Sequence, residues 1–304
     1  MLSRKHKLLL MKIVSLFSVV RGYNIPIIAL AQYLSAIFIF AHERRALHIL
    51  LDGKLFVLVL STTLTIASGY IINNFYDSRK DLINRPHKSM LDRLVSQRTK
   101  LHVYFSLNLL SCVLASMVSW RAIVFFSFYI FLIWFYSHKI KRFPLIGNLM
   151  AAFLAILPFF AILMYYKNFY HVIFIHAVFL FLLLLIREMV KDLENLTGDL
   201  ANGYETIPVR FGEAMSKRII TLLVLLTVLP VYALTDVYDV GYMDLYLYCA
   251  LTTLVIFLLV LWRATSKRQF NLLHNLLKGL IVAGVFSIVL IDPSTVLHAR
   301  EMLD

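Results

Sequence analysis

Two clusters of acidic and amide side chains stand out in a chain that otherwise has few acids. The clusters are Asn73, Asp77 and Asp81, and Glu188, Asp192, Asn195 and Asp199. Their members are three or four residues apart, and side chains with that spacing share one face of a helix. We therefore expect each cluster to present its oxygen atoms along a single helical face.

Oxygen-rich faces of this kind suit a magnesium ion and a phosphate group. Mg²⁺ prefers oxygen ligands and is often held by one or two carboxylates together with the phosphates of a substrate. Basic side chains that could neutralise the remaining phosphate charge are Arg79, Lys88, Lys141, Arg142 and Lys191. The alternative is that the acids are solvated residues at helix ends that offset neighbouring bases. Two clusters with helical spacing favour the functional interpretation.

The composition indicates which elements must position these clusters. Of the 304 residues, 61% are hydrophobic and 15% are charged, and the mean hydropathy is +0.80. Soluble domains have about 45–50% apolar and about 25% charged residues. We therefore predict an integral membrane protein and exclude a disordered chain or a small disulfide scaffold.

Nine stretches are long and apolar enough to form membrane spans, each needing about 20 residues. They lie at 13–40, 55–76, 101–119, 122–138, 146–166, 170–187, 217–235, 244–262 and 272–291. No segment between them is long enough for a separate soluble domain. The sequence therefore predicts an all-α fold, in which residues 1–304 form one bundle of nine transmembrane helices.

The distribution of positive charge predicts the orientation of the bundle. With nine spans, most of the 30 lysines and arginines fall on the side of the N-terminus, including the loops that contain both acidic clusters. Cytoplasmic loops carry such an excess. We expect a multi-pass protein of an inner or cytoplasmic membrane, with the N-terminus and the loops of both clusters on the cytoplasmic side. This excess also accounts for the net charge of +13, so we expect no nucleic acid partner.

Arg21 is the charge that is hardest to place in a lipid environment. It lies inside the first apolar stretch, where a charge is costly and usually faces a polar cavity. Asn24, one turn further on, shares its face. We expect both to line a pocket, although Arg21 could instead reach the interface. An apolar pocket beside two acidic faces suggests ionisation of a prenyl diphosphate, with the metal and cations stabilising the departing diphosphate.

In the residues around both acidic clusters, the chain resembles the UbiA superfamily of intramembrane prenyltransferases. Residues 73–81, followed by Asn84-Arg85-Pro86, resemble its first signature, N-D-x-x-D-x-x-x-D and then N-[RK]-P. Residues 187–199, with the Gly, Thr and Pro that follow at 203, 206 and 208, resemble the second. Within the family, the second signature most resembles that of the geranylgeranylglycerol-phosphate geranylgeranyltransferase-like subgroup.

Two shorter segments extend the resemblance. Residues 136–148, from Tyr136 through Lys141 and Arg142, are similar to a conserved family segment, and Arg21 with Asn24 is similar to its R-x-x-N element. The resemblance implies a Mg²⁺-dependent prenyltransferase with a prenyl diphosphate donor and a lipophilic acceptor. The acceptor would be a quinone or aromatic precursor, or a lipid of the geranylgeranylglyceryl phosphate type.

The resemblance also assigns roles to individual residues. The catalytic residues would be Asp77, Asp81, Asp192 and Asp199, and the metal ligands Asp77, Asp81, Asn195 and Asp199. The substrate-binding residues would be Arg21, Asn24, Asn73, Asn74, Arg79, Asn84, Arg85, Lys88, Tyr136, Lys141, Arg142 and Lys191.

The chain departs from the family pattern at two positions. Asn74 and Asn195 stand where the signatures have Asp. An amide oxygen can still bind Mg²⁺, but it brings no charge. This leaves open a second hypothesis, a membrane protein of the same fold that binds or carries a prenyl or lipid diphosphate with reduced catalysis. The sequence also leaves the prenyl chain length and the oligomeric state open.

Overall fold

The computed structural model describes residues 4–41 and 44–293, and over these residues the chain is helical without any β-strand. Its main helices are α1 (Arg4–Val19), α2 (Ile25–Ser35), α3 (Ala46–Leu50), α4 (Gly53–Asn84), α5 (Pro86–Asp92), α6 (Gln97–Val118), α7 (Trp120–His138), α8 (Ile146–Tyr166), α9 (His171–Glu194), α10 (Leu196–Ala201), α11 (Ile207–Leu226), α12 (Val228–Tyr232), α13 (Met243–Arg263) and α14 (Lys267–Ser287). Short segments η1 (Ala36–Phe40), η2 (Ile140–Arg142), η3 (Ala233–Val237) and η4 (Ile288–Ile291) extend or connect them.

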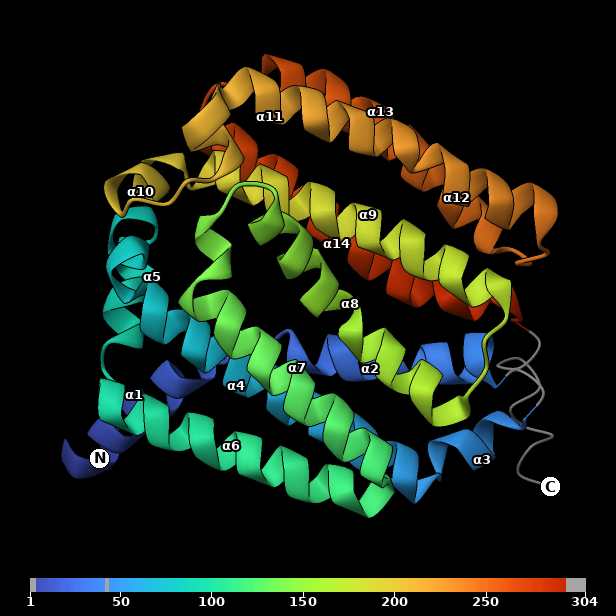
Figure 1. The fold of residues 1–304 in the computed structure, drawn as a ribbon, viewed down its shortest axis with the longest axis horizontal. Helices are drawn as coiled ribbons and strands as arrows, with labels where there is room; N and C mark the ends of the chain where they lie inside the picture. The colour runs from blue at the N-terminus through green and yellow to red at the C-terminus, as the bar shows by residue number, and fades with distance from the viewer. Residues whose placement is uncertain (1–3, 42–43, 294–304) are drawn as a thin grey trace.

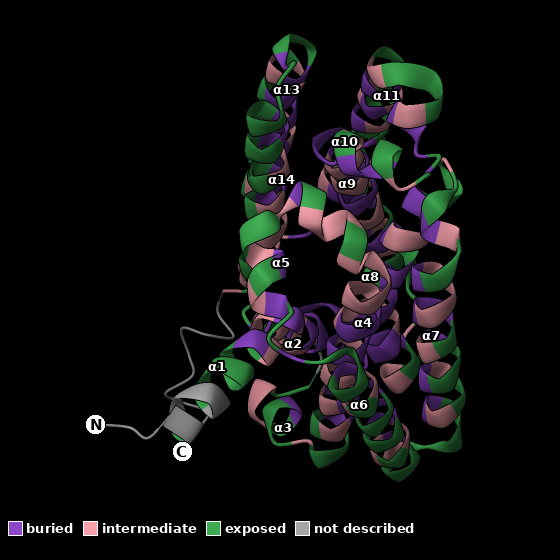
Figure 2. Ribbon diagram, turned by 90° about the vertical axis from the view of Figure 1, so that its left-hand side faces the viewer, coloured by how far each residue is buried: buried purple, intermediate pink, exposed green. Residues whose placement is uncertain are grey.

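Within the described residues, eight helical segments are long and apolar enough to span a membrane. They correspond to eight of the nine predicted stretches, so the all-α membrane fold is confirmed. Large apolar side chains such as Leu109, Leu222 and Leu245 are exposed on the outer faces of the bundle, where Figure 2 shows the ribbon as mostly exposed. Such faces suit contact with lipid.

The first predicted span, 13–40, is not one continuous helix. It is split into α1 and an α2–η1 segment, and Arg21, between them, has a positive φ of 50°. Pro26 in the first turn of α2 favours a new helix start there. The α2–η1 segment is at most roughly 24 Å long at about 1.5 Å per residue. The count of nine therefore holds only if this shorter segment is counted as the first helix.

Helix α4 carries the first acidic cluster and is 32 residues long. At its start, Asp52 accepts hydrogen bonds from the backbone N–H groups of Lys54 and Leu55 at 3.0 and 3.2 Å. The helix ends at Asn84, because a proline disfavours the helical conformation in the residue before it. Arg85 accordingly has a φ of −143°, and Pro86 begins α5.

Two groups of helices build the bundle. Buried apolar residues of η1, α4, α6, α7 and α8 form most of one core cluster, and those of α9 and α11–α14 form a second. In Figure 1 the blue-to-green helices of the first group lie below the yellow-to-red helices of the second. The groups are joined where α8 packs on α9 and α2 packs on α14.

Candidate active site

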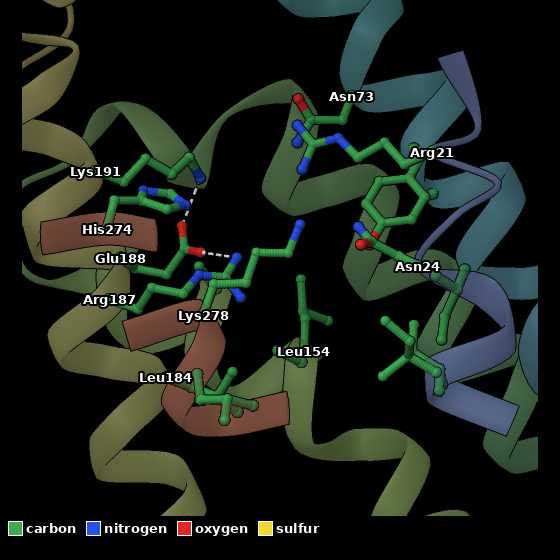
Figure 3. Close-up of a pocket in the computed structure, with 18 of the residues that line it drawn as sticks. Arg21, Asn24, Asn73, Leu154, Leu184, Arg187, Glu188, Lys191, His274 and Lys278 are labelled. Carbon is green, nitrogen blue, oxygen red and sulfur yellow. Dashed lines mark hydrogen bonds and ion pairs between the residues drawn. The ribbon is translucent and has the colours of Figure 1, made fainter. Parts of the chain in front are cut away.

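A cavity of about 930 Å³ lies between the two groups of helices. Its wall is formed by α2, α4, α7, α8, α9, α14 and the segment around α5. Figure 3 shows polar side chains at one end and the apolar Leu154 and Leu184 at the other. The cavity therefore joins a charged region to an apolar region.

The first cluster faces this cavity from α4. Asn73, Asp77 and Asp81 all line it, because α4 continues as a helix through Asn84. This is the arrangement that their spacing predicts. Asp81 has no ion-pair partner within 4.0 Å in residues 4–41 and 44–293.

Asp77 is held by two groups from other elements. Its Oδ1 accepts hydrogen bonds from Lys141 Nζ at 2.7 Å and from the hydroxyl of Tyr204 at 2.9 Å. Lys141 lies on the short segment η2 between α7 and α8, and Tyr204 follows α10. Gly203 permits the turn into Tyr204, since its φ is 67°. Asp77 thus ties together three segments that are distant in the sequence.

The second cluster does not share one helical face, and this expectation was wrong. Helix α9 ends at Glu194, and Asn195, with φ −99° and ψ 8°, separates it from α10. Asp192 and Asn195 line the cavity, whereas Asp199 lies in α10 and is fully buried. The Oδ1 atom of Asp199 forms an ion pair with Lys80 Nζ at 2.5 Å. The spacing could not reveal the break in the helix.

Two acids of α9 have defined partners. Asp192 Oδ2 accepts a hydrogen bond from Asn148 Nδ2 at 2.7 Å. Glu188 pairs with Arg187 at 3.1 Å and with Lys191 at 2.5 Å. Both acids line the cavity opposite Asp77. The carboxylates of α4 and α9 therefore meet across one space.

Asn84 and Gly198 lock the ends of the two signatures against each other. A Cβ atom at Gly198 would lie 2.3 Å from Asn84 Nδ2, so only glycine allows this approach. Arg85 also pairs with Glu194 at 3.3 Å. The side-chain amide of Asn84 is buried and has no hydrogen-bond partner among the described residues. It is therefore free to bond to a ligand.

Asn74 belongs to a separate polar network at the edge of the site. Its Oδ1 accepts a hydrogen bond from Lys100 Nζ at 2.8 Å, and its Nδ2 donates to Asp92 Oδ2 at 3.0 Å. Asp92 also accepts from Ser18 at 2.9 Å, which connects α5 to α1. Asp92 and Lys100 are both buried. The amide of Asn74 therefore bridges a buried cation and a buried carboxylate.

Most of the predicted site residues line the cavity. Those that do are Arg21, Asn24, Asn73, Asn74, Asp77, Asp81, Asn84, Arg85, Lys88, Tyr136, Lys141, Glu188, Lys191, Asp192 and Asn195. Three do not. Asp199 is buried behind Lys80, Arg79 is exposed, and the guanidinium of Arg142 lies 5.5 Å from the centre of the Tyr204 ring.

Three further features of the site are not marked by the sequence motifs: Lys80, Tyr204 and the polar face of α14. Lys80 lies three residues after Asp77, so it turns to the same side of α4. His274 and Lys278, one turn apart on α14, also line the cavity. Charged residues within an apolar span are a functional signal. The sequence does not indicate the position of Tyr204, which depends on the turn after α10.

Burial shifts the pKa values of two of the paired groups outside the spans. It raises the pKa of Asp199, although Lys80 acts in the opposite direction. It lowers the pKa of Lys141, although Asp77 opposes this shift. Both shifts disfavour the charged forms, so each of these charges needs its partner.

The donors around the cavity are of the kind that Mg²⁺ prefers. The carboxylates of Asp77, Asp81 and Asp192 and the amides of Asn73 and Asn195 all line it. In the described part of the chain, no three His, Cys, Asp or Glu side chains lie close enough to hold one ion. Several of these carboxylates instead bond to lysines or amides. The types of donor fit the metal, and its binding would require Lys141 and Asn148 to release Asp77 and Asp192.

Curated relatives of the chain come from archaea. The chain is 29% identical over 259 residues to a digeranylgeranylglyceryl phosphate synthase of Korarchaeum cryptofilum, covering 80% of this chain and 86% of the relative. It is 25% identical over 251 residues to the synthase of the same name from Methanobrevibacter smithii, covering 77% and 86%. Both matches extend over most of the chain.

Solved structures share the fold. A UbiA homologue from Archaeoglobus fulgidus, solved bound to GPP and Mg²⁺, superposes with a TM-score of 0.67 at 14% identity, covering 90% of this chain and 99% of the other. A UbiA homologue from Aeropyrum pernix in its apo form gives a TM-score of 0.65 at 13% identity, covering 99% and 100%.

The family model that matches the chain is that of the UbiA prenyltransferase family, over residues 29–277. This span includes both acidic clusters and most of the residues that line the cavity. It confirms the resemblance found in the signatures and the prediction that the protein is a membrane-embedded prenyltransferase. The chain belongs to the UbiA prenyltransferase family.

Proposed function

We propose that the protein transfers a prenyl group from a prenyl diphosphate to a phosphate-bearing prenylglycerol lipid, with Mg²⁺ as its metal. The observation that carries this proposal is that Asp77, Asp81 and Asp192 line one cavity from two helices. The same cavity continues into an apolar region that could hold a prenyl chain. A carrier would need no such facing carboxylates, so we favour catalysis.

The diphosphate would bind at the charged end of the cavity. Asp77, Asp81 and Asp192 would hold the metal, with the amide oxygens of Asn73 and Asn195 beside them. When bound, Mg²⁺ would neutralise the negative charge that develops on the departing diphosphate. Lys88 and Lys191, which also line the cavity, could contact phosphate oxygens directly.

Lys141 would change its partner when the diphosphate binds. In the structure Lys141 pairs with Asp77, and phosphate oxygens would compete for its ammonium group. Release of Lys141 would leave Asp77 for the metal. The place of Asp199 in the second signature implies a metal ligand, but Asp199 is buried outside the cavity lining and pairs with Lys80, so we assign it a structural role.

The reaction then follows from the chemistry of an allylic diphosphate. The carbon–oxygen bond breaks, and its electron pair leaves on the diphosphate. The acceptor hydroxyl oxygen bonds to the allylic carbon, and its proton passes to the departing diphosphate. The rings of Tyr70, Tyr136 and Phe159 line the cavity and could face the positively charged carbon.

The relatives from Korarchaeum cryptofilum and Methanobrevibacter smithii carry the name digeranylgeranylglyceryl phosphate synthase. We therefore propose a geranylgeranylglyceryl phosphate-type lipid as the acceptor, in preference to a quinone or aromatic precursor. The subgroup suggested by the second signature agrees with this choice.

The test is an assay of the purified full-length protein in lipid nanodiscs. Prenyl diphosphates of several chain lengths are supplied with Mg²⁺ and with either the phosphate lipid or an aromatic acceptor, and mass spectrometry identifies products. We expect product from the phosphate lipid, no product in EDTA, and recovery when Mg²⁺ is restored. Product formation in EDTA would contradict the metal assignment. Binding of a non-hydrolysable donor without any product would favour the carrier hypothesis.

We also propose that both signatures face the cytoplasm, because the basic residues are concentrated on that side. The exposed residues Gln97 and Thr197 lie beside the two signatures, and exposed Lys167 lies in the loop between α8 and α9. Single cysteines at these positions, in a background without Cys112 and Cys249, can be probed in intact cells with an impermeant thiol reagent. We expect labelling at position 167 only. Labelling at 97 or 197 would reverse the orientation.

A further inference from the structure

We infer that the cavity contains a second anion site, formed by Arg21, Arg187 and Lys278, which holds the phosphate group of the acceptor. The nature of the acceptor rests on the proposed function. The three cations come from the turn before α2, from α9 and from α14, so only the folded bundle brings them together.

Arg21 and Lys278 have no acidic partner. Neither forms an ion pair within 4.0 Å in residues 4–41 and 44–293. Each lies near an aromatic ring instead. Arg21 Cζ is 5.0 Å from the centre of the Tyr70 ring, and Lys278 Nζ is 4.8 Å from that of Tyr23. The charged groups of both side chains are therefore available to bind an anion.

Arg187 is only partly satisfied. One terminal nitrogen donates to Glu188 at 3.1 Å, but its Nε is buried and has no partner among the described residues. Arg187, Arg21 and Lys278 are all positively charged, and all three line the same cavity. Figure 3 shows the nitrogen ends of Arg21 and Lys278 pointing into the space that Arg187 also borders. A bound anion would relieve this mutual repulsion and satisfy the buried donor.

This site differs in kind from the region around the α4 carboxylates. There, Lys80 and Lys141 are already paired with Asp199 and Asp77. Arg21 and Asp81 line the same cavity. The second anion site is therefore beside the proposed metal site but has an excess of positive charge of its own.

An apolar wall continues from the cations. Leu183 and Leu184 lie one turn before Arg187 on α9, and Ile281 and Val282 lie one turn after Lys278 on α14. All four line the cavity. Residues three or four apart on a helix share a face. The ligand that fits is an amphiphile, with a phosphate at the three cations and a hydrocarbon chain along these side chains.

Binding of two simple probes tests the site on the full-length protein. Dodecyl phosphate and dodecanol share a chain and differ in the phosphate, and isothermal titration in neutral detergent measures their binding. We expect Lys278→Gln and Arg187→Gln each to weaken dodecyl phosphate binding about tenfold, the loss typical of a charged hydrogen bond. Dodecanol binding and the affinity for a non-hydrolysable prenyl diphosphate should change less than about twofold.

Two variants serve as controls. Lys278→Arg keeps the charge and should retain dodecyl phosphate binding. Lys139→Gln removes a lysine that is exposed and does not line the cavity, and should have no effect. A parallel loss of donor affinity in Lys278→Gln would assign the cations to the donor diphosphate and overturn the inference. Equal binding of dodecanol and dodecyl phosphate would also overturn it.

The acceptor assay separates this inference from the proposed function. If the protein transfers prenyl groups to the phosphate lipid and both glutamine variants keep its KM, the function stands and the anion site is wrong. If no acceptor is prenylated but dodecyl phosphate binding still depends on Lys278 and Arg187, the anion site stands and the proposed function is wrong.

Discussion

The two acidic signatures have similar spacing but different structures. In the first, α4 continues through all its members, and Asn73, Asp77 and Asp81 face one cavity. In the second, α9 ends at Glu194, and Asp199 turns away into α10 and is buried with Lys80. Similar spacing thus gave a continuous ligand face in one case and a structural contact between helices in the other.

This difference shows that residues of the second signature also hold α4, which carries the first signature, in position. Lys80 belongs to α4, and its partner Asp199 belongs to α10. Asn84, at the end of α4, fits against Gly198. Contacts of this kind fix the axial position and rotation of α4 relative to α9. They therefore also fix the positions of Asp77 and Asp192 across the cavity.

The largest effect should come from breaking the ion pair between Asp199 and Lys80. Asp199→Ala leaves the Lys80 ammonium without its partner, and loss of one member of a buried pair costs about 3 kcal/mol. We expect a clear fall in the thermal unfolding temperature in detergent. Adding Lys80→Met should restore part of the loss, because the unpaired charge is removed. An unchanged unfolding temperature in Asp199→Ala would show that the ion pair contributes nothing.

Gly198→Ala should be the next most damaging change. The added Cβ would overlap the Asn84 side chain, and overpacking of a tight contact costs about 1–3 kcal/mol. The double variant Gly198→Ala with Asn84→Ala should recover stability, since the smaller side chain removes the overlap. Gly279→Ala is the matched control, because nothing lies within 4 Å of a Cβ at that position. If both glycine variants behave alike, the contact does not lock the two signatures.

Asp81→Asn should separate catalysis from stability. Asp81 lines the cavity and has no ion-pair partner within 4.0 Å among the described residues. Its replacement should leave the unfolding temperature unchanged. The rate of prenyl transfer should fall at least about tenfold, which is about 1.4 kcal/mol of barrier. A loss of stability without a loss of rate would reverse the contrast with Asp199.

Substitution of the two asparagines that stand in place of aspartates should give the smallest effects. The effects at the two positions should also differ from each other. Asn195 lines the cavity beside Asp192, so Asn195→Asp should lower the Mg²⁺ concentration for half-maximal activity a few-fold, or about 0.5–1 kcal/mol. Asn74 bonds to Asp92 and Lys100, so Asn74→Asp would bring two carboxylates together. We expect Asn74→Asp to lower stability slightly and to leave the Mg²⁺ dependence unchanged. An equal gain in Mg²⁺ affinity from both would show that Asn74 reaches the metal.

The amino-acid sequence is sufficient to predict an all-α membrane protein. An apolar content of 61% and apolar stretches of about 20 residues indicate membrane-spanning helices, because a helix satisfies its backbone hydrogen bonds within one segment. The spacing of Asn73, Asp77 and Asp81 determined their shared face, since nothing in that segment interrupts a helix. Pro86 accounts for the end of α4 at Asn84, because proline restricts the residue before it.

Tertiary structure alone decided how the second half of the site is used. Asn195 stops α9 although no proline or glycine marks that position, so Asp199 reaches Lys80 instead of the cavity. The turn at Arg21 divides a stretch that hydropathy predicts as one span. The meeting of Arg21, Arg187 and Lys278 joins three distant segments. These features depend on which side chains the packed helices bring together, and local sequence patterns contain no record of contacts between segments so far apart in the chain.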